Sequence, residues 1–429
     1  MAEARAVPGP ALVEPVVPVS GGWIAANTLA NLGMAMAVVT PPQFQLADQA
    51  AAFGSGGRFL VLGLVNAAGS LAGIVSTPLI GALSDRTSRG SVPILGSGHG
   101  RRHPWTLVTA IAGALCLVLL GYQDTAPGII GCWFGFNFFQ GGMFASLSAS
   151  VPDLVPPQQR ATVSGWVGMP QALGLVAGGL LVTRLTSGVA GAYLLLAAGM
   201  VTLALPFVLL TRDPVLEPWH RPPFSAAALV RSFGFDPRRH PDFGWAWLAR
   251  LLMMTAHAVG TLYLPYFLEG AVDGHAGGAH RAESRLLVLV TVFSLVAVVA
   301  AVAAGITSDR LARRRPLVAA AGLTMAAAAL SLAFFQSWSA VLAAAVVFGL
   351  GFGAYIAVSQ ALITEVLPAA ENRAKDLGVV HIANLGSYVI GGVVAVPVVA
   401  LGGYSALYVL VSITALIGSL VIFRVRGVR

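Results

Sequence analysis

Residues 81–86 read Gly-Ala-Leu-Ser-Asp-Arg, and residues 100–104 read Gly-Arg-Arg-His-Pro. The same order of charges returns in the second half of the chain. Residues 305–310 read Gly-Ile-Thr-Ser-Asp-Arg, and residues 313–316 read Arg-Arg-Arg-Pro. Only 10% of the residues are charged, so two matching clusters of charge indicate an internal duplication.

A second repeated phrase supports the duplication. The segment Asp153-Leu-Val-Pro156 precedes Arg160, and the segment Glu365-Val-Leu-Pro368 precedes Arg373. Each copy follows an apolar stretch at the same place in its half. The chain is therefore expected to consist of two related halves.

The composition places the chain in a membrane. The chain is 57% hydrophobic and its mean hydropathy is +0.81, so a soluble globule could not cover its apolar surface. The two cysteines, Cys116 and Cys132, lie in apolar segments and suggest neither a disulfide framework nor a metal site. Residues 1–21 lack the basic and apolar regions of a signal peptide, and we interpret them as a cytoplasmic tail.

Twelve apolar stretches are long enough to span a bilayer, which takes ~20 helical residues. They lack the alternation of barrel strands, so the predicted fold is an all-α membrane protein of two pseudo-symmetric six-helix bundles. The expected spans are residues 22–40, 58–80, 105–122, 128–150, 161–183, 188–211, 244–268, 285–306, 317–335, 338–361, 376–400 and 404–424.

Basic residues predict the orientation. With the N-terminus in the cytoplasm, most arginines fall in cytoplasmic loops, as the positive-inside rule requires. The net charge of +8 is then a topology signal and needs no nucleic-acid partner. The proline-rich residues 212–243, with a short interfacial helix expected near residues 225–233, form a cytoplasmic linker between bundles at 22–211 and 244–429.

These features resemble a known family. The Gly-x-x-x-Asp-Arg element between spans 2 and 3, echoed between spans 8 and 9, is similar to the signature of the major facilitator superfamily. The fuller string from Ser84 to Arg89, continued at 100–105, and the stretch from Asn137 to Arg160 resemble the branch of sucrose transporters and related glycoside symporters. Here about ten residues, Gly90 to His99, separate the two parts of the string. The resemblance implies a secondary transporter, not an enzyme.

The repeated charges suggest a gate. Asp85 can face a basic side chain or a helix N-terminus, and Arg102 needs a carboxylate such as Asp153. We expect two cytoplasmic clusters that hold an inner gate shut, while topology and loop solubility alone remain the alternative. The gating candidates are Asp85, Arg86, Arg102, Asp153 and Arg160 in the first half, and Asp309, Arg310, Arg314, Glu365 and Arg373 in the second.

Polar residues inside spans are candidates for the substrate path, because they are costly in lipid. Arg250, His257 and Thr261 lie within about 40° on one face of span 7. His381, Asn384 and Tyr388 share a face of span 11 whose glycines suggest helix packing, so we expect them at an interface. The substrate-binding candidates are Asn27, Asn31, Asn137, Gln140, Arg250, His257, Thr261 and Tyr355.

No acidic residue lies deep within an expected span. A proton would therefore be carried by His257, whose side-chain class titrates near pH ~6.5, or by Asp153. The resemblance places a coupling aspartate at Asp153, although a structural gate role is favoured there. Proton coupling and passive diffusion both remain open.

The sequence thus predicts a transporter in the bacterial cytoplasmic membrane, multi-pass and monomeric, with both termini in the cytoplasm. Its expected partners are a small solute, protons if transport is coupled, and the lipid bilayer, with no nucleic acid, metal or cofactor. A hydroxylated solute such as a sugar or glycoside suits Asn, Gln, Ser and Tyr side chains. The alternatives are an exporter of amphipathic drugs or metabolites, and a non-transporting membrane sensor or assembly factor. The sequence contains no nucleophile elbow, zinc-protease motif or phosphate loop.

Overall fold

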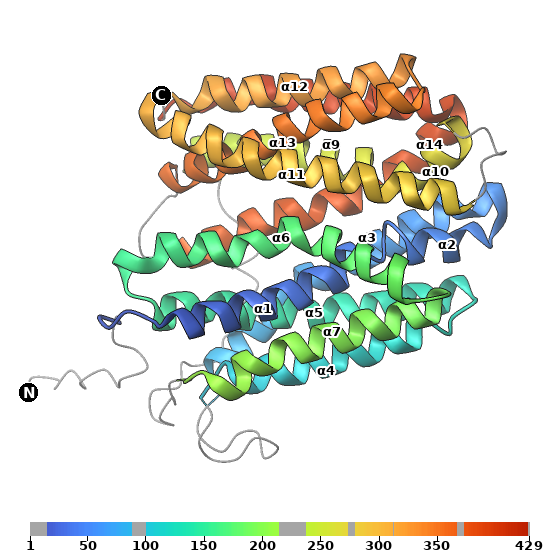
Figure 1. The fold of residues 1–429 in the computed structure, drawn as a ribbon. Coiled ribbons are helices and arrows are strands. Elements are labelled where there is room, and N and C mark those ends of the chain that lie inside the picture. The colour runs from blue at the N-terminus through green and yellow to red at the C-terminus, as the bar shows by residue number, and fades with distance from the viewer. Residues whose placement is uncertain are drawn as a thin grey trace, which may run out of the picture. The chain divides into compact units, whose positions relative to one another are not determined.

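The computed structural model describes residues 15–87, 100–213, 237–272, 279–311, 313–366 and 373–427. Within these ranges every regular element is a helix (Figure 1). The first half contains α1 (Gly21–Val39), α2 (Gln45–Ala51), α3 (Gly54–Asp85), α4 (His103–Leu120), α5 (Ala126–Leu154), α6 (Pro157–Leu185) and α7 (Val189–Leu210).

The second half begins with three consecutive pieces, α9 (Pro241–Leu262), α10 (Leu264–Phe267) and the π-turn η3 (Leu268–Val272). These pieces occupy the seventh predicted span. The remaining elements are α11 (Ala279–Leu311), α12 (Arg314–Phe334), α13 (Trp338–Glu365), α14 (Arg373–Val421) and the 3₁₀ turn η5 (Ile422–Arg424).

The predicted spans correspond to these helices. Of the helices in the described ranges, eight are long and apolar enough to cross a membrane, and ten if the bent pairs in α6 and α9–α10 each form one span. The last two predicted spans share α14, which is interrupted at Gly403. Gly403 has a φ of 65°, a conformation that glycine adopts without steric cost, so it turns the chain between two helical segments.

The chain divides into two compact units. Unit 1 contains residues 1–39, 72–123 and 131–229, and unit 2 contains residues 40–71, 124–130 and 230–429. The boundary therefore falls inside α3, whose first part packs in unit 2. The predicted linker helix at 225–233 and the Gly90 to His99 segment lie outside the described residues.

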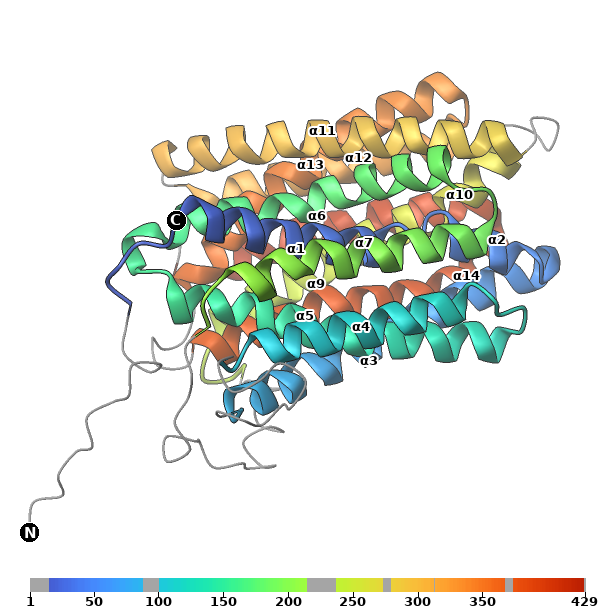
Figure 2. The same ribbon diagram turned by 60° about the horizontal axis from the view of Figure 1, so that its bottom comes forward.

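Unit 1 is built on α1 and α7. Helix α1 packs along α6 and α7, and α4 packs along α7 (Figure 2). Small residues permit this closeness. A Cβ added at Gly174 of α6 would lie 2.7 Å from the Cβ of Ala35 in α1. In membranes such contacts replace the hydrophobic effect as the source of helix association.

Unit 2 is also built from long helices that pack side by side. Helix α9 packs along α14, and α13 packs along α11 and α12. At Gly353 of α13 the backbone touches α11 so closely that an added Cβ would collide with the backbone of Ala297. Gly305 of α11, in contrast, has open space where a Cβ would be.

This pair of glycines gives a test of the packing. We expect Gly353→Ala to lower the thermal unfolding temperature, because the extra methyl group forces α13 from α11 at a cost of about 2 kcal/mol. Gly305→Ala should leave it unchanged or raise it slightly, because alanine favours helix. Fluorescence-detected thermal unfolding in detergent measures both. Equal effects would contradict the close approach at Gly353.

Candidate functional site

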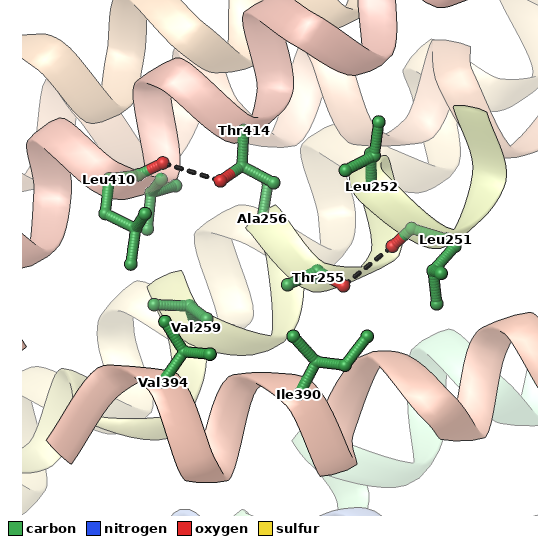
Figure 3. Close-up of a pocket in the computed structure, with 10 residues that line it drawn as sticks. Leu251, Leu252, Thr255, Ala256, Val259, Ile390, Val394, Leu410 and Thr414 are labelled. Carbon is green, nitrogen blue, oxygen red and sulfur yellow. Dashed lines mark hydrogen bonds between the residues drawn. The ribbon is translucent and has the colours of Figure 1, made fainter. Parts of the chain in front are cut away.

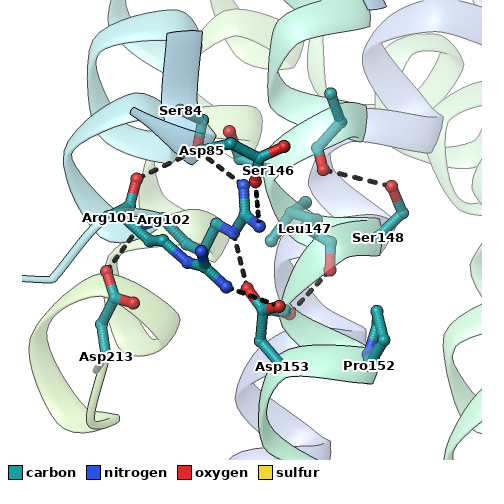
Figure 4. Close-up of polar contacts among 12 residues, drawn as sticks. Ser84, Asp85, Arg101, Arg102, Ser146, Leu147, Ser148, Pro152, Asp153 and Asp213 are labelled. Carbon is teal, nitrogen blue, oxygen red and sulfur yellow. Dashed lines mark hydrogen bonds and ion pairs between the residues drawn. The ribbon is translucent and has the colours of Figure 1, made fainter. Parts of the chain in front are cut away.

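One candidate site is an ionic cluster in unit 1, formed by Asp85, Arg101, Arg102 and Asp153 (Figure 4). Arg102 Nη2 lies 2.6 Å from Asp85 Oδ1, and Arg102 Nε lies 2.8 Å from Asp153 Oδ2. Arg101 Nη2 lies 2.8 Å from the other oxygen of Asp153. The cluster joins the end of α3, the start of α4 and the end of α5.

Burial distinguishes the two carboxylates. The side chain of Asp153 is 16% exposed, whereas that of Asp85 is 49% exposed, and Arg102 retains only 5%. Arg102 Nη1 also donates to Ser84 Oγ at 3.0 Å. Asp153 is therefore the main counter-ion, because its two oxygens pair with two buried guanidinium groups at once.

A third acid, Asp213, holds the start of α4. Its Oδ2 accepts the backbone N–H groups of Arg102 at 2.7 Å and His103 at 2.8 Å. This is a helix N-terminus, where a negative charge is favourable. Burial raises the pKa of the Asp213 carboxyl, and these two hydrogen bonds act against that rise. For Arg102, burial lowers the pKa, but Asp153 and Asp85 more than offset it, so the net shift is upward.

Unit 2 contains the counterpart of this cluster. Arg314 Nη1 lies 2.8 Å from Glu365 Oε1 and 2.6 Å from the carbonyl oxygen of Ala361. The bond therefore joins the start of α12 to the end of α13. Arg310 is exposed near the end of α11, and the side chains of Asp309 and Arg373 lie outside what the structure describes.

The other arginines predicted for a gate lie at helix ends. Arg160 Nε donates to the carbonyl oxygen of Val155 at 3.0 Å, and its Nη2 donates to that of Pro152 at 3.2 Å. It thereby caps the end of α5 with a positive charge. Arg86 lies in the turn that follows α3.

Of the predicted polar residues in unit 1, one bonds to another helix and two bond within their own helix. Asn27 Nδ2 donates to Ser150 Oγ of α5 at 3.0 Å, and Asn31 Nδ2 donates to Asn27 Oδ1 at 2.9 Å. Asn137 Nδ2 donates to the carbonyl oxygen of Trp133, one turn earlier, at 2.9 Å. Gln140 is half-buried. Asn27 thus links α1 to α5, and Asn137 is bonded within α5.

Arg250 lies at the meeting of three helices in unit 2. From α9, its Nε donates to Asn384 Oδ1 of α14 at 2.8 Å, and its Nη1 donates to Ser359 Oγ of α13 at 3.2 Å. Tyr355 of α13 and His381 of α14 are close enough to interact with it electrostatically. These five residues are the Arg250 cluster. The sequence predicted Arg250 and Tyr355 as site residues but placed Asn384 and His381 at a packing interface.

His257 lies in a separate aromatic environment. Its ring stacks on Phe352 with 4.0 Å between centroids, and the centroids of Phe293 and Phe348 lie 5.9 Å and 6.3 Å away. Thr261 Oγ1 donates to the His257 carbonyl oxygen at 2.8 Å. Arg250, His257 and Thr261 share a helix face, as expected, yet Arg250 and His257 contact different groups of residues.

An aromatic latch, which the sequence did not reveal, forms at the other end of α3. It consists of six side chains in unit 2. Arg58 Nη1 lies 3.2 Å from Glu269 Oε2, and the guanidinium carbon lies 4.7 Å from the Tyr266 ring centroid. The members are Arg58, Phe59, Tyr263, Tyr266, Glu269 and Tyr404.

Two hydrogen bonds fasten the latch to the backbone. Tyr266 Oη donates to the Ala47 carbonyl oxygen in α2 at 2.8 Å, and Tyr404 Oη donates to the Tyr266 carbonyl oxygen at 2.8 Å. Arg58 and Phe59 belong to the first turns of α3, whereas Asp85 of the ionic cluster is its last residue.

A small cavity of about 170 Å³ lies between α9 and α14 (Figure 3). Two threonines line it, Thr255 and Thr414, and each hydroxyl donates to a carbonyl oxygen of its own helix. The remaining lining is aliphatic, including Val259, Ile390 and Val394. The cavity therefore offers no polar group to a hydroxylated ligand, and the site must be sought elsewhere.

The comparisons with known proteins decide the family. The family model described as Major Facilitator Superfamily matches residues 24–279 and 276–429, which together cover nearly the whole chain. The chain belongs to this superfamily. It is therefore a multi-pass membrane transporter of the secondary type and not an enzyme. No protein in the search of curated sequences matches the chain.

A solved structure supports the fold. A crystal structure of the nucleoside transporter NupG matches this superfamily member with a TM-score of 0.72, covering 94% of this chain and 99% of that one. The sequences are only 12% identical, so the match concerns the fold alone. In the described part of the chain no group of His, Cys, Asp and Glu side chains is arranged to hold a metal ion.

The ionic cluster leads to a stability prediction. We expect Asp153→Asn to lower the free energy of unfolding by about 3 kcal/mol, since it leaves two buried guanidinium groups with less counter-charge. Asp85→Asn removes a half-exposed partner and should cost about 1 kcal/mol or less. Thermal unfolding of both variants in the same detergent measures the difference. Equal losses would show that Asp153 is not the main counter-ion.

Proposed function

We propose that this superfamily member moves a small hydroxylated solute, a sugar or glycoside, across the bacterial cytoplasmic membrane by alternating access. The Arg250 cluster is the observation that carries the proposal. It gathers guanidinium, hydroxyl, amide and imidazole groups from α9, α13 and α14 at a depth where polar groups are costly. Such groups match the donors and acceptors of a polyhydroxylated solute.

The orientation follows from the charges. We place both termini and the ends that carry Arg102, Arg160 and Arg314 in the cytoplasm, as the positive-inside rule requires. The aromatic latch then belongs to the outer side. We further propose that the protein works as a monomer with one bundle at 22–211, a cytoplasmic linker at 212–243 and a second bundle at 244–429, and without a nucleic-acid partner.

Alternating access assigns roles to the two ends of the helices. The ionic cluster and the Arg314–Glu365 pair stabilise the cytoplasmic ends, and the latch stabilises the outer ends. Opening on one side breaks the contacts of that side and keeps those of the other. The gating candidates thereby act by setting the relative populations of the two open states.

Proton coupling is the less supported part of the proposal. Asp153 is engaged by two arginines, which favours a structural role over a titrating one. Within the described part of the chain, His257 lies among three phenylalanine rings and not among charged groups. Coupled and passive transport therefore remain alternatives that the uptake experiment separates.

The same aromatic surroundings support a second candidate. Phe293, Phe348 and Phe352 present rings to which an amphipathic drug or metabolite could bind. Export of such a compound is the alternative within transport. A non-transporting sensor on the same fold is the alternative outside it.

Uptake into proteoliposomes tests the proposed function. Labelled disaccharides should accumulate in vesicles that contain the protein, and Arg250→Gln should reduce the initial rate at least tenfold. A proton uncoupler should abolish accumulation if transport is coupled, and leave equilibration unchanged if it is passive. Absence of saccharide uptake with uptake of an amphipathic dye would favour the exporter. Absence of uptake of either solute would contradict both transport functions.

Variants at the two ends test the gating roles. Asp85→Asn weakens the cytoplasmic contacts and should shift the protein toward the inward-open state. Tyr266→Phe removes the bond to Ala47 and should shift it outward. Cysteine probes in the outer cavity, labelled in intact cells, should therefore react more slowly in the first variant and faster in the second. Unchanged rates in both variants would refute these roles.

A further inference from the structure

Arg250 is a charge inside a membrane-spanning helix. It lies about 9 Å along the helix from residue 244, where the expected span begins, in the cytoplasmic part of a hydrocarbon layer of ~30 Å. A guanidinium group does not give up its proton, so its charge must be stabilised in place. A polar residue at such a depth usually faces a functional cavity, with a partner that can be identified.

The chain does not supply a negative partner at that depth. No described carboxylate forms an ion pair with Arg250. In the sequence, the acidic residues of the expected spans all lie at helix ends, such as Asp153, Glu269 and Glu365. Glu365, on the same helix as Ser359, lies about 9 Å further along α13 and pairs with Arg314.

The guanidinium group keeps one free edge. Nε and Nη1 are occupied by the neutral acceptors Asn384 Oδ1 and Ser359 Oγ, and Nη2 has no acceptor among the described residues. Arg250 retains 6% of its surface, and Nη2 is not one of the described unpaired polar atoms that are fully enclosed. Nη2 therefore keeps some accessible surface, and its two N–H groups and the second N–H of Nη1 remain for a ligand on a guanidinium held by two helices.

The geometry points to a solute that brings the missing charge: a polyhydroxylated monocarboxylate whose carboxylate binds Arg250. A carboxylate accepts two parallel N–H groups from a guanidinium. One arginine balances one negative charge, whereas a phosphate dianion would leave a net charge buried at the site. Tyr355, Ser359 and His381 surround the arginine with groups that can bond to the solute hydroxyls.

This inference rests on the proposed function and narrows its substrate class from hydroxylated solutes to acidic ones. An acidic solute also explains why the residues that contact Arg250 from α13 and α14 supply an amide and a hydroxyl but no acid. The bound solute and Arg250 would be neutral together, which lowers the cost of holding both charges within the bilayer.

Matched pairs of compounds test the inference. The full chain in lipid nanodiscs is heated with D-gluconate or D-glucitol, with D-glucuronate or D-glucose, and with D-galacturonate or D-galactose. Each acid differs from its partner mainly by the carboxylate. At least one acid should raise the unfolding temperature by several degrees at millimolar concentration, and its neutral partner should give less than half of that shift. Equal shifts within each pair, or no shift with any acid, would overturn the inference.

Two variants show whether Arg250 is responsible. Arg250→Gln should abolish the shift produced by the acid, whereas the matched control Arg184→Gln, which removes an exposed charge at the end of α6, should keep it. If Arg250→Gln does not fold, Asn384→Asp is measured in its place. It places a carboxylate beside Nε, so the unliganded protein should stay folded while the acid-induced shift disappears. Retention of the full shift in Asn384→Asp would contradict the assignment.

The experiments distinguish a failure of the proposed transport function from a failure of the acidic substrate class. If labelled disaccharides enter proteoliposomes but no acid stabilises the protein, transport of hydroxylated solutes stands and the acidic substrate class is wrong. If an acid stabilises the protein but neither it nor a disaccharide is taken up, the binding site stands and the transport function is wrong.

Discussion

The cost of placing charge in a bilayer determines where this chain keeps its ionic groups. Its expected spans hold acids only at their ends, and there Asp153 pairs with both Arg101 and Arg102. Because the ion pairs are partly buried, loss of one partner is costly, and the ends of α3, α4 and α5 are held together. Arg250 is the exception to this placement, and its exceptional position makes it the best candidate for contact with a solute.

Much of the fold could be predicted from the sequence, because hydrophobic length and the repeated charges are local signals. The predicted spans correspond to helices, and the break between the last two falls at Gly403, whose positive φ requires glycine. The association of Asp85, Arg102 and Asp153 also followed from the sequence, since unlike charges at neighbouring helix ends have few other partners. The structure brings these three together, and their role as a gate stays a prediction.

The rest depends on contacts that the sequence pattern does not encode. Asp213 looked like the start of a linker, and only the fold brings it to the first turn of α4. Asn384 looked like a packing residue because glycines surround it, yet its amide oxygen binds Arg250. The latch depends on an aromatic cluster between residues about 200 positions apart, such as Phe59 and Tyr263, for which periodicity gives no signal.

We propose that charges at the cytoplasmic helix ends control opening. Double electron–electron resonance tests this directly with spin labels at Leu210 and Leu311 for the cytoplasmic side, and at Tyr122 and Ser405 for the outer side, all exposed positions. In lipid nanodiscs, Arg102→Gln should shift the Leu210–Leu311 population toward longer distances and the Tyr122–Ser405 population toward shorter ones. If both distances lengthen, or both stay unchanged, the charges at the cytoplasmic helix ends do not control opening.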